Sequence, residues 1–159
     1  MARDVLAIFV DPARMRVEVE GRRGGVAMDS APPDGDGTAM SPREALLAAL
    51  AGCTSMDVAS ILRKKRQAVD GYELAVHGEE AAEHPQVFTA ITVEHRVRGD
   101  VDPEAIRRSV ELSATQYCPV SALLSRGVEI EHRYRLTRRD GTEQAALVVV
   151  TGPAGARGA

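Results

Sequence analysis

Aromatic residues are scarce in this sequence: it has no tryptophan, and Phe and Tyr together make up only 3% of the chain. Little is therefore available for stacking on nucleic-acid bases. The formal net charge of -3 and the pI near 5.8 also give no attraction to phosphates or to an anionic membrane surface. Neither nucleic acid nor a membrane is expected as a partner.

Long hydrophobic runs and cysteines are also scarce. The longest runs, residues 5–10 and 45–53, fall far short of the roughly 20 apolar residues that span a bilayer. Residues 1–4 open no secretory signal, so we expect a cytoplasmic protein. Only Cys53 and Cys118 occur, and in such a compartment a redox or buried-thiol role is more natural than a structural disulfide.

Metal-binding motifs are missing as well. The four histidines, His77, His84, His95 and His132, have no ligand-like spacing, and neither CxxC nor HExxH occurs. No metal is expected, and the histidines are predicted to lie on strand surfaces. A cysteine–histidine hydrolase that uses His95 or His132 stays open as a distant alternative, although nothing in the sequence specifically indicates it.

A long helix over residues 41–67 is the strongest pattern present. Ser41 can cap its first turn, and Glu44, three residues later, completes a capping box. Residues 45–53 are only Ala, Leu, Gly and Cys, so this half of the helix should be surrounded by other elements. Cys53 would lie near the centre of a helix that is roughly 40 Å long.

Alternating hydrophobic residues predict strands on both sides of this helix. The predicted strands cover residues 5–10, 15–20, 26–29, 72–76, 91–97, 128–136 and 145–151. Strands 72–76 and 91–97 should pair in antiparallel fashion. A second helix is predicted to begin at the cap Asp102 and a short third one at the N-cap Cys118, whereas residues 152–159 should form a flexible tail.

This order of elements predicts an α+β fold in a single domain over residues 1–159. The three N-terminal strands have no nearby partner in the sequence, and the long helix has more apolar surface than one small sheet can cover. A homodimer that shares strands is the predicted assembly.

The two cysteines differ in their predicted surroundings. Cys118 lies at a helix N-terminus, where amide hydrogens and the helix dipole favour the thiolate and lower the pKa below the usual value of about 8.5. Cys53 follows Gly52, whose missing side chain lets another group approach closely. Asp57, one turn on, would disfavour the Cys53 thiolate if it faced the same pocket, and a cation would then be required. Either cysteine can equally be a small buried apolar residue.

Assistance for Cys53 is not expected from the start of its own helix. Glu44 is predicted to be a capping residue, and it lies about 13 Å from Cys53 along the helix. Arg43, the residue before it, is at a similar distance. Joint action would require the partner subunit. Four arginines are candidates for a cation that stabilises the thiolate: Arg14, Arg16, Arg22 and Arg23. Arginines on an N-terminal hairpin are, however, more often exposed to solvent.

Three stretches carry a recognisable pattern: SPREALLAALAGCTSMDVASIL, HPQVFTAITVEHRV and ELSATQYCPVSALLSRGVEIEHRYRL. Together they resemble the OsmC/Ohr family, named for osmotically inducible protein C and organic hydroperoxide resistance. The resemblance runs from about residue 15 to residue 136. Its most specific feature is a cysteine inside a long helix, followed 65 residues later by a second cysteine in a Tyr-Cys-Pro-Val-Ser context.

The resemblance implies an intertwined α+β homodimer, with antiparallel sheets around the long central helix and active sites at the subunit interface. It also implies a peroxidase that reduces organic hydroperoxides in oxidative stress defence. In that family pattern Cys53 is the peroxidatic thiol that becomes a sulfenic acid, and Cys118 resolves it as a disulfide. Dithiols, including lipoyl groups in one branch, would regenerate the thiols, and no cofactor is expected.

One position departs from the family pattern. Well-characterised peroxidases of this family carry a catalytic glutamate ten residues before the first cysteine, where this chain has Arg43, and Glu44 is one position off. The arginine partner of that glutamate cannot be matched to one residue either. The pair Asp57-Val58 looks closer to an OsmC-like branch with poorly defined substrates. The alternative function is a non-catalytic protein that binds a small apolar or thiol-reactive ligand at the dimer interface.

Overall fold

The computed structural model describes residues 3–158 and forms two compact units, Met1–Leu47 and Ala48–Ala159. The N-terminal unit holds an antiparallel sheet in the order β1-β2-β3. Its strands are β1 (Val5–Asp11), β2 (Arg16–Gly21) and β3 (Gly24–Met28), with a 3-10 turn η1 (Pro12–Arg14) between the first two. The three predicted N-terminal strands are thus confirmed.

This N-terminal sheet leaves apolar side chains uncovered. Val5 is 73% exposed, Leu6 59% and Phe9 55%. A small sheet gains independent stability only when its hydrophobic face packs against something. The sheet therefore presents an apolar surface that a further partner can cover.

The long helix α1 (Pro42–Lys64) begins with the predicted capping box. The Ser41 amide donates to Glu44 Oε2 at 2.7 Å, and the Glu44 amide donates to Ser41 Oγ at 3.2 Å. Two amides that the first helical turn would leave unpaired are satisfied in this way. Glu44 is confirmed as a capping residue, and the helix ends three residues before the predicted boundary.

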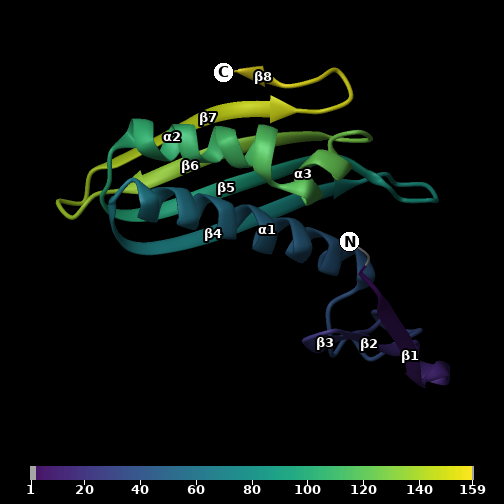
Figure 1. The fold of residues 1–159 in the computed structure, drawn as a ribbon. Helices are drawn as coiled ribbons and strands as arrows, with labels where there is room; N and C mark the ends of the chain where they lie inside the picture. Colours follow the sequence, from purple (N-terminus) through teal and green to yellow (C-terminus); the bar gives the residue numbers. More distant parts are fainter. Residues whose placement is uncertain (1–2, 159) are drawn as a thin grey trace. The chain divides into compact units, whose positions relative to one another are not determined.

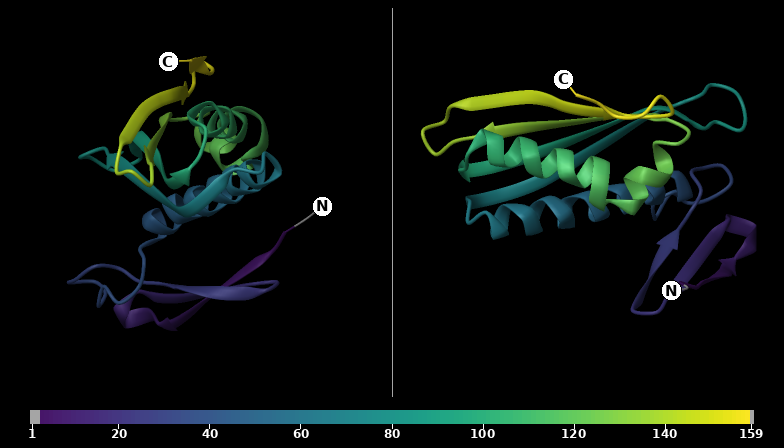
Figure 2. Two further views of the ribbon diagram at one scale, coloured as in Figure 1. Left: turned by 90° about the vertical axis from the view of Figure 1, so that its left-hand side faces the viewer. Right: turned by 45° about the horizontal axis from the view of Figure 1, so that its top comes forward.

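The second unit holds a five-stranded sheet with the helices on one face (Figure 1). Its further elements are β4 (Ala68–Glu80), β5 (Phe88–Asp100), α2 (Pro103–Leu112), a π-helical turn η2 (Ser113–Tyr117), α3 (Pro119–Leu124), β6 (Glu129–Thr137), β7 (Glu143–Thr151) and β8 (Arg157–Gly158). α1 and α2 lie side by side, and the sheet curves around them (Figure 2). All predicted strands and helices of this unit are present.

The sheet is mixed, in the order β4-β5-β6-β7-β8. The predicted antiparallel pairing of β4 with β5 is confirmed, whereas β5 and β6 are parallel. A parallel pair needs a crossover connection, and here α2, η2 and α3 form it. Within the predicted tail, Arg157 and Gly158 pair with β7, so that part of residues 152–159 is a strand.

One stripe of α1 forms its buried side. Leu50, Thr54, Val58 and Leu62 follow one another at four-residue spacing and are at most 1% exposed. Residues at this spacing share one helix face. Val58 and Leu62 join the main hydrophobic core, which also contains residues of α2, β5, β6 and β7.

The opposite side of α1 is uncovered, contrary to the prediction that residues 45–53 are surrounded. Leu46 is 41% exposed, Met56 is 73% exposed, and Ala48 and Ala49 are also exposed. A single sheet contacts only one side of a helix, so the sheet of the second unit leaves the other side of α1 open. By length and composition α1 could even cross a membrane, a test that core helices of soluble proteins also pass. Its buried stripe indicates a core helix.

Two of the four histidines are buried, which corrects the prediction that all lie on strand surfaces. His95 and His132 are 0% exposed, whereas His77 is exposed on β4 as predicted and His84 is exposed in the loop between β4 and β5. Along β5, His95 lies two residues from buried Val93 and two residues from buried Val97. Side chains two residues apart share one face of a strand, so His95 lies on the same face as these two valines, the face that the helices cover.

The stability of the protein should decrease as the pH decreases, because of these two histidines. Burial, reinforced by the charge of His132, lowers the pKa of His95 to about 3, and burial lowers that of His132 to about 4. Histidine in an unfolded chain titrates near 6.5. Between about pH 6.5 and pH 4 only the unfolded chain takes up these protons. Each histidine therefore lowers the free energy of unfolding by up to about 1.4 kcal/mol for each unit by which the pH decreases.

Urea unfolding at pH 7, 6 and 5 measures this dependence. His95→Gln and His132→Gln should each reduce its slope, because the substituted chain lacks one imidazole that only the unfolded state protonates. The matched control is the exposed His77→Gln, which should keep the wild-type slope. Equal slopes for all three variants would contradict the interpretation.

Candidate functional site

Cys53, Asp57 and Cys118 meet in the second unit. The two Sγ atoms and one carboxylate oxygen of Asp57 all lie within 4.8 Å of one another. Cys53 and Asp57 are one helical turn apart on α1, which puts them on the same face. Cys118 reaches them from the crossover, at the junction of η2 and α3. Tertiary structure thus brings together two cysteines that are 65 residues apart in the sequence.

Cys118 is buried and surrounded by hydrogen-bond donors. It is 2% exposed and forms the predicted N-cap of α3. Its Sγ accepts a hydrogen bond from the Ser121 amide at 3.3 Å and another from the Thr54 hydroxyl at 3.4 Å. Thr54 neighbours Cys53 on α1, so the two sulfurs are tied to the same turn of that helix. Sequence reasoning did not identify Thr54 or Ser121.

Ser113 holds both the carboxylate and the buried cysteine in place. Its hydroxyl donates to Asp57 Oδ2 at 3.1 Å, and its carbonyl accepts from the Cys118 amide at 2.9 Å. The hydrogen bond to the Ser113 carbonyl belongs to the π-helical turn η2, which follows α2 and is wider than an α-helical turn. Such turns occur frequently at functional sites. The sequence predicted an interruption before Pro119 but contained no signal for the π geometry.

The surroundings of Cys53 disfavour its thiolate. The pKa of Cys53 is raised to about 11; burial is the largest cause, followed by the hydrogen bond with Cys118. The backbone of Val120 opposes this, while the charges of Cys118 and Asp57 add to it. Asp57 lies beside the thiol, so the condition under which it was predicted to oppose ionisation of Cys53 is met. Cys53 is therefore a protonated thiol near neutral pH unless a positive charge approaches it.

A shallow groove runs along the exposed side of α1 next to β4. It has a volume of about 420 Å³ and is lined by Ala51, Gly52, Ser55, Met56, Ala59, Tyr72 and Leu74. A Cβ added to Gly52 would meet nothing within 4 Å, so this side of the helix is open at the residue before Cys53. The Tyr72 hydroxyl bonds with His95 Nδ1 at 2.7 Å, and burial together with Asp57 raises the pKa of Tyr72.

The buried histidines do not contact the sulfurs. His95 bonds with Tyr72, and His132 Nε2 lies 3.5 Å from Ser121 Oγ and 3.4 Å from Thr151 Oγ1. Within residues 3–158, no hydrogen bond joins an imidazole to Cys53 or to Cys118. The structure therefore offers no support for the cysteine–histidine hydrolase.

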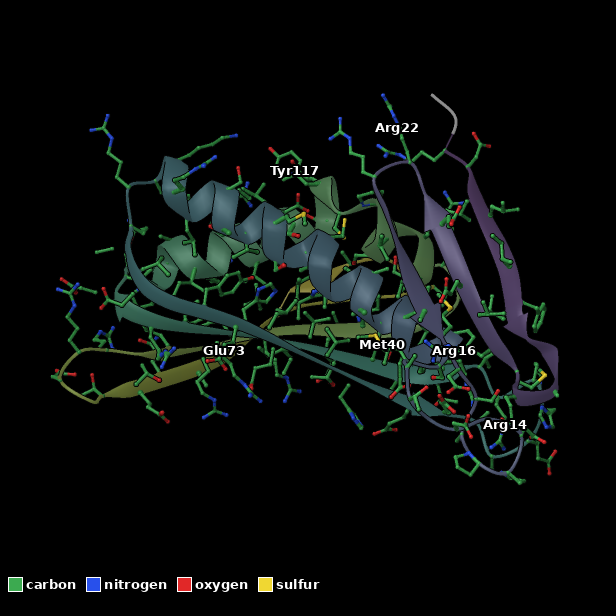
Figure 3. All side chains as sticks on the ribbon, turned by 90° about the horizontal axis from the view of Figure 1, so that it is seen from below. Arg14, Arg16, Arg22, Met40, Glu73 and Tyr117 are labelled. Carbon is green, nitrogen blue, oxygen red and sulfur yellow. The ribbon has the colours of Figure 1, made fainter. Side chains whose placement is uncertain are left out.

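The candidate arginines belong to the N-terminal unit. Arg14 forms an ion pair with Asp36 at 3.0 Å, and Arg16 donates to Thr38 Oγ1 at 2.8 Å. Figure 3 shows Arg14 and Arg22 at opposite ends of the N-terminal sheet. Arg22 and its neighbour Arg23 are exposed in the turn between β2 and β3, as predicted for solvated arginines.

Comparisons with known proteins agree on one family. A family model described as OsmC-like protein matches residues 35–133. Protein YhfA of Escherichia coli (strain K12) is 41% identical over 99 residues, which cover 62% of this chain and 74% of that protein. The predicted single domain over residues 1–159 extends beyond both matched regions and stays a prediction.

Solved structures share the fold. A hypothetical protein from Aquifex aeolicus VF5 has a TM-score of 0.78 at 22% identity, over 87% of this chain and 98% of that one. The organic hydroperoxide resistance protein OhrB of Bacillus subtilis has a TM-score of 0.61 at 16% identity, over 84% of this chain and 98% of that one. At these identities the likeness shows the fold alone, and it confirms the predicted α+β OsmC-like class.

Alkylation should report the raised pKa of Cys53. Because the thiolate is the reactive form, the rate of Cys53 modification by iodoacetamide in the monomeric chain should keep rising above pH 9 and level off near pH 11. Asp57→Asn removes one of the charges that raise the pKa of Cys53, so the rate should level off at a lower pH. Peptide mass spectrometry after timed labelling measures the rate at Cys53 separately from that at Cys118.

The exposed Asp100→Asn is the matched control and should leave the curve unchanged. A rate that levels off below about pH 8.5 in the monomeric chain would contradict the prediction. The same result in an assembled dimer would show that a positive charge acts on the thiol there.

Proposed function

Because the chain belongs to the OsmC-like protein family, we propose that it is a cytoplasmic, thiol-dependent peroxidase that reduces organic hydroperoxides. The observation that carries this proposal is the close approach of two free thiols, Cys53 and Cys118, from separate elements. A relative in fold is named for organic hydroperoxide resistance. The role would be in oxidative stress defence.

Exposure supports the division of roles between the cysteines. Cys53 is half-buried, whereas Cys118 is 2% exposed, so an incoming hydroperoxide meets Cys53 first. The Cys53 sulfur attacks the O–O bond, which yields a sulfenic acid and releases the alcohol. Cys118 then attacks the sulfenic sulfur, forming the disulfide and releasing water. An external dithiol, of the lipoyl type or another, reduces the disulfide by exchange.

The peroxidase needs a positive neighbour for Cys53, because the neighbouring groups of its own unit raise its pKa. Arginine is suited to this task since it stays charged at all relevant pH values. The candidates are the arginines of the N-terminal sheet, and in the proposed homodimer the partner subunit would supply one of them. Arg43 occupies the position of the family's catalytic glutamate, so the acid of that pattern is replaced here by a base.

A homodimer would cover the apolar surfaces that the single chain leaves exposed. Met56 is 73% exposed on the open side of α1, beside Gly52 and Ala59, where another backbone could approach closely. The apolar residues of β1 are exposed as well. Burial of about 25 cal/mol per Å² of such surface favours association.

The second candidate function is a non-catalytic binding protein. The groove beside α1 and the raised pKa of Cys53 favour this alternative, because they describe an apolar recess next to an unactivated thiol. Its ligand would be small and either apolar or thiol-reactive.

Titration of the reduced protein with cumene hydroperoxide distinguishes the two functions. The wild type should lose both thiols at equimolar peroxide and form an intramolecular disulfide, with slower loss in hydrogen peroxide. Cys53→Ser should abolish the reaction, and Cys118→Ser should stop at the sulfenic acid because the resolving thiol is missing. Intact mass and free-thiol counts follow each step. Thiols that stay unreacted would refute the peroxidase and favour the binding protein.

Light scattering after size exclusion tests the assembly. The wild type should be a dimer, and Met56→Glu should dissociate it, because the substitution puts a charge into the proposed apolar interface. Val87→Glu, at a 58% exposed position before β5, is the control that should stay dimeric. A wild type that runs as a monomer at micromolar concentration would exclude the dimer.

A further inference from the structure

The meeting of two thiols and a carboxylate points to a metal site: we propose that Cys53, Asp57 and Cys118 of the reduced protein bind one Zn²⁺ ion. The inference goes beyond the peroxidase, since it assigns the cluster a ligand that needs no oxidant. It rests on the arrangement of these three side chains and on the donors around them.

The ligand atoms are close to the positions that zinc requires. Zn–S bonds of about 2.3 Å and Zn–O bonds of about 2.0–2.2 Å place tetrahedral ligand atoms roughly 3.5–3.8 Å apart. The two Sγ atoms and the Asp57 oxygen already lie within 4.8 Å of one another. Adjustments of about 1 Å, within reach of side-chain rotation, complete the site. Cys53 is half-buried, which leaves an entry path and a fourth position for water.

Hydrogen bonds around the cluster suit its ionised form. The Thr54 hydroxyl and the Ser121 amide both donate to Cys118 Sγ, and the Ser113 hydroxyl donates to Asp57 Oδ2. Donors of this kind orient metal ligands and stabilise the negative charge that they carry. Two such donors reach the buried sulfur and one reaches the carboxylate, so two of the three ligands are already held.

The charge of the ligands suits a divalent cation. Two thiolates and one carboxylate whose ligand atoms lie within 4.8 Å of one another repel each other, and a cation between them offsets this repulsion. When Zn²⁺ binds, each thiol releases its proton to solvent, two Zn–S bonds and one Zn–O bond form, and no electron is transferred. Thiolate ligands select zinc over magnesium or calcium, which prefer oxygen.

This proposal departs from the sequence expectation of no metal. The three ligands come from α1 and from the crossover, so no short motif reveals them. A zinc-bound cluster also cannot form the Cys53–Cys118 disulfide, because both sulfurs are occupied. The metal-bound protein is consequently a form in which the thiols are protected from oxidation.

Titration of the reduced, metal-free full chain with Co²⁺, followed by displacement with Zn²⁺, tests the site. One Co²⁺ per chain should bind, with thiolate-to-cobalt charge-transfer absorption and tetrahedral d–d bands that Zn²⁺ removes. Cys53→Ser and Cys118→Ser should each lose most of the charge-transfer absorption. Asp57→Asn, with both thiols intact, should weaken Zn²⁺ binding about tenfold or more in competition with a chromophoric chelator.

The controls separate this site from surface binding and from misfolding. Asp100→Asn removes an exposed carboxylate and should keep the wild-type Zn²⁺ affinity. Each variant is compared by circular dichroism and by thiol count after denaturation. Zn²⁺ should also protect both thiols of the wild type from N-ethylmaleimide. Absent charge-transfer absorption, or equal Zn²⁺ affinity in wild type and Asp57→Asn, would overturn the proposal whether or not the protein reduces peroxides.

Discussion

The packing of one side of α1 into the core is the constraint on which the rest of the second unit depends. Leu50, Thr54, Val58 and Leu62 form that side, and Val58 and Leu62 reach the residues of the sheet and of α2. Once this stripe is buried, the rotation of the helix is fixed. Cys53 then lies next to Cys118 of the crossover and stays half-buried.

The crossover between β5 and β6 supplies the other half of the site. A parallel strand pair requires such a connection, and the π-helical turn at its centre places Ser113 where it contacts both Asp57 and the backbone of Cys118. The reactive groups are thus held by a change in helical geometry. The same feature that links two parallel strands brings the second sulfur to the first.

The site combines features that act against each other. Close sulfurs favour disulfide chemistry, yet burial and the neighbouring Asp57 keep Cys53 protonated. A positive charge resolves this conflict in either proposed state, as an arginine in the peroxidase or as Zn²⁺ in the metal-bound form. Asp57 takes part in both states, because its charge opposes ionisation of Cys53 and its carboxylate is a ligand in the proposed metal site.

Local patterns in the sequence determined the capping box of Ser41 and Glu44, the strands, and Cys118 as the N-cap of α3. Each of these depends on residues close together in the chain, where hydrogen bonding and side-chain periodicity act directly. Tertiary structure alone decided the burial of His95 and His132, the role of Ser113 and the meeting of Asp57 with both sulfurs. The physical reason is that desolvation and contact between distant segments depend on how the helices cover the sheet. Neither property is contained in the spacing of neighbouring residues.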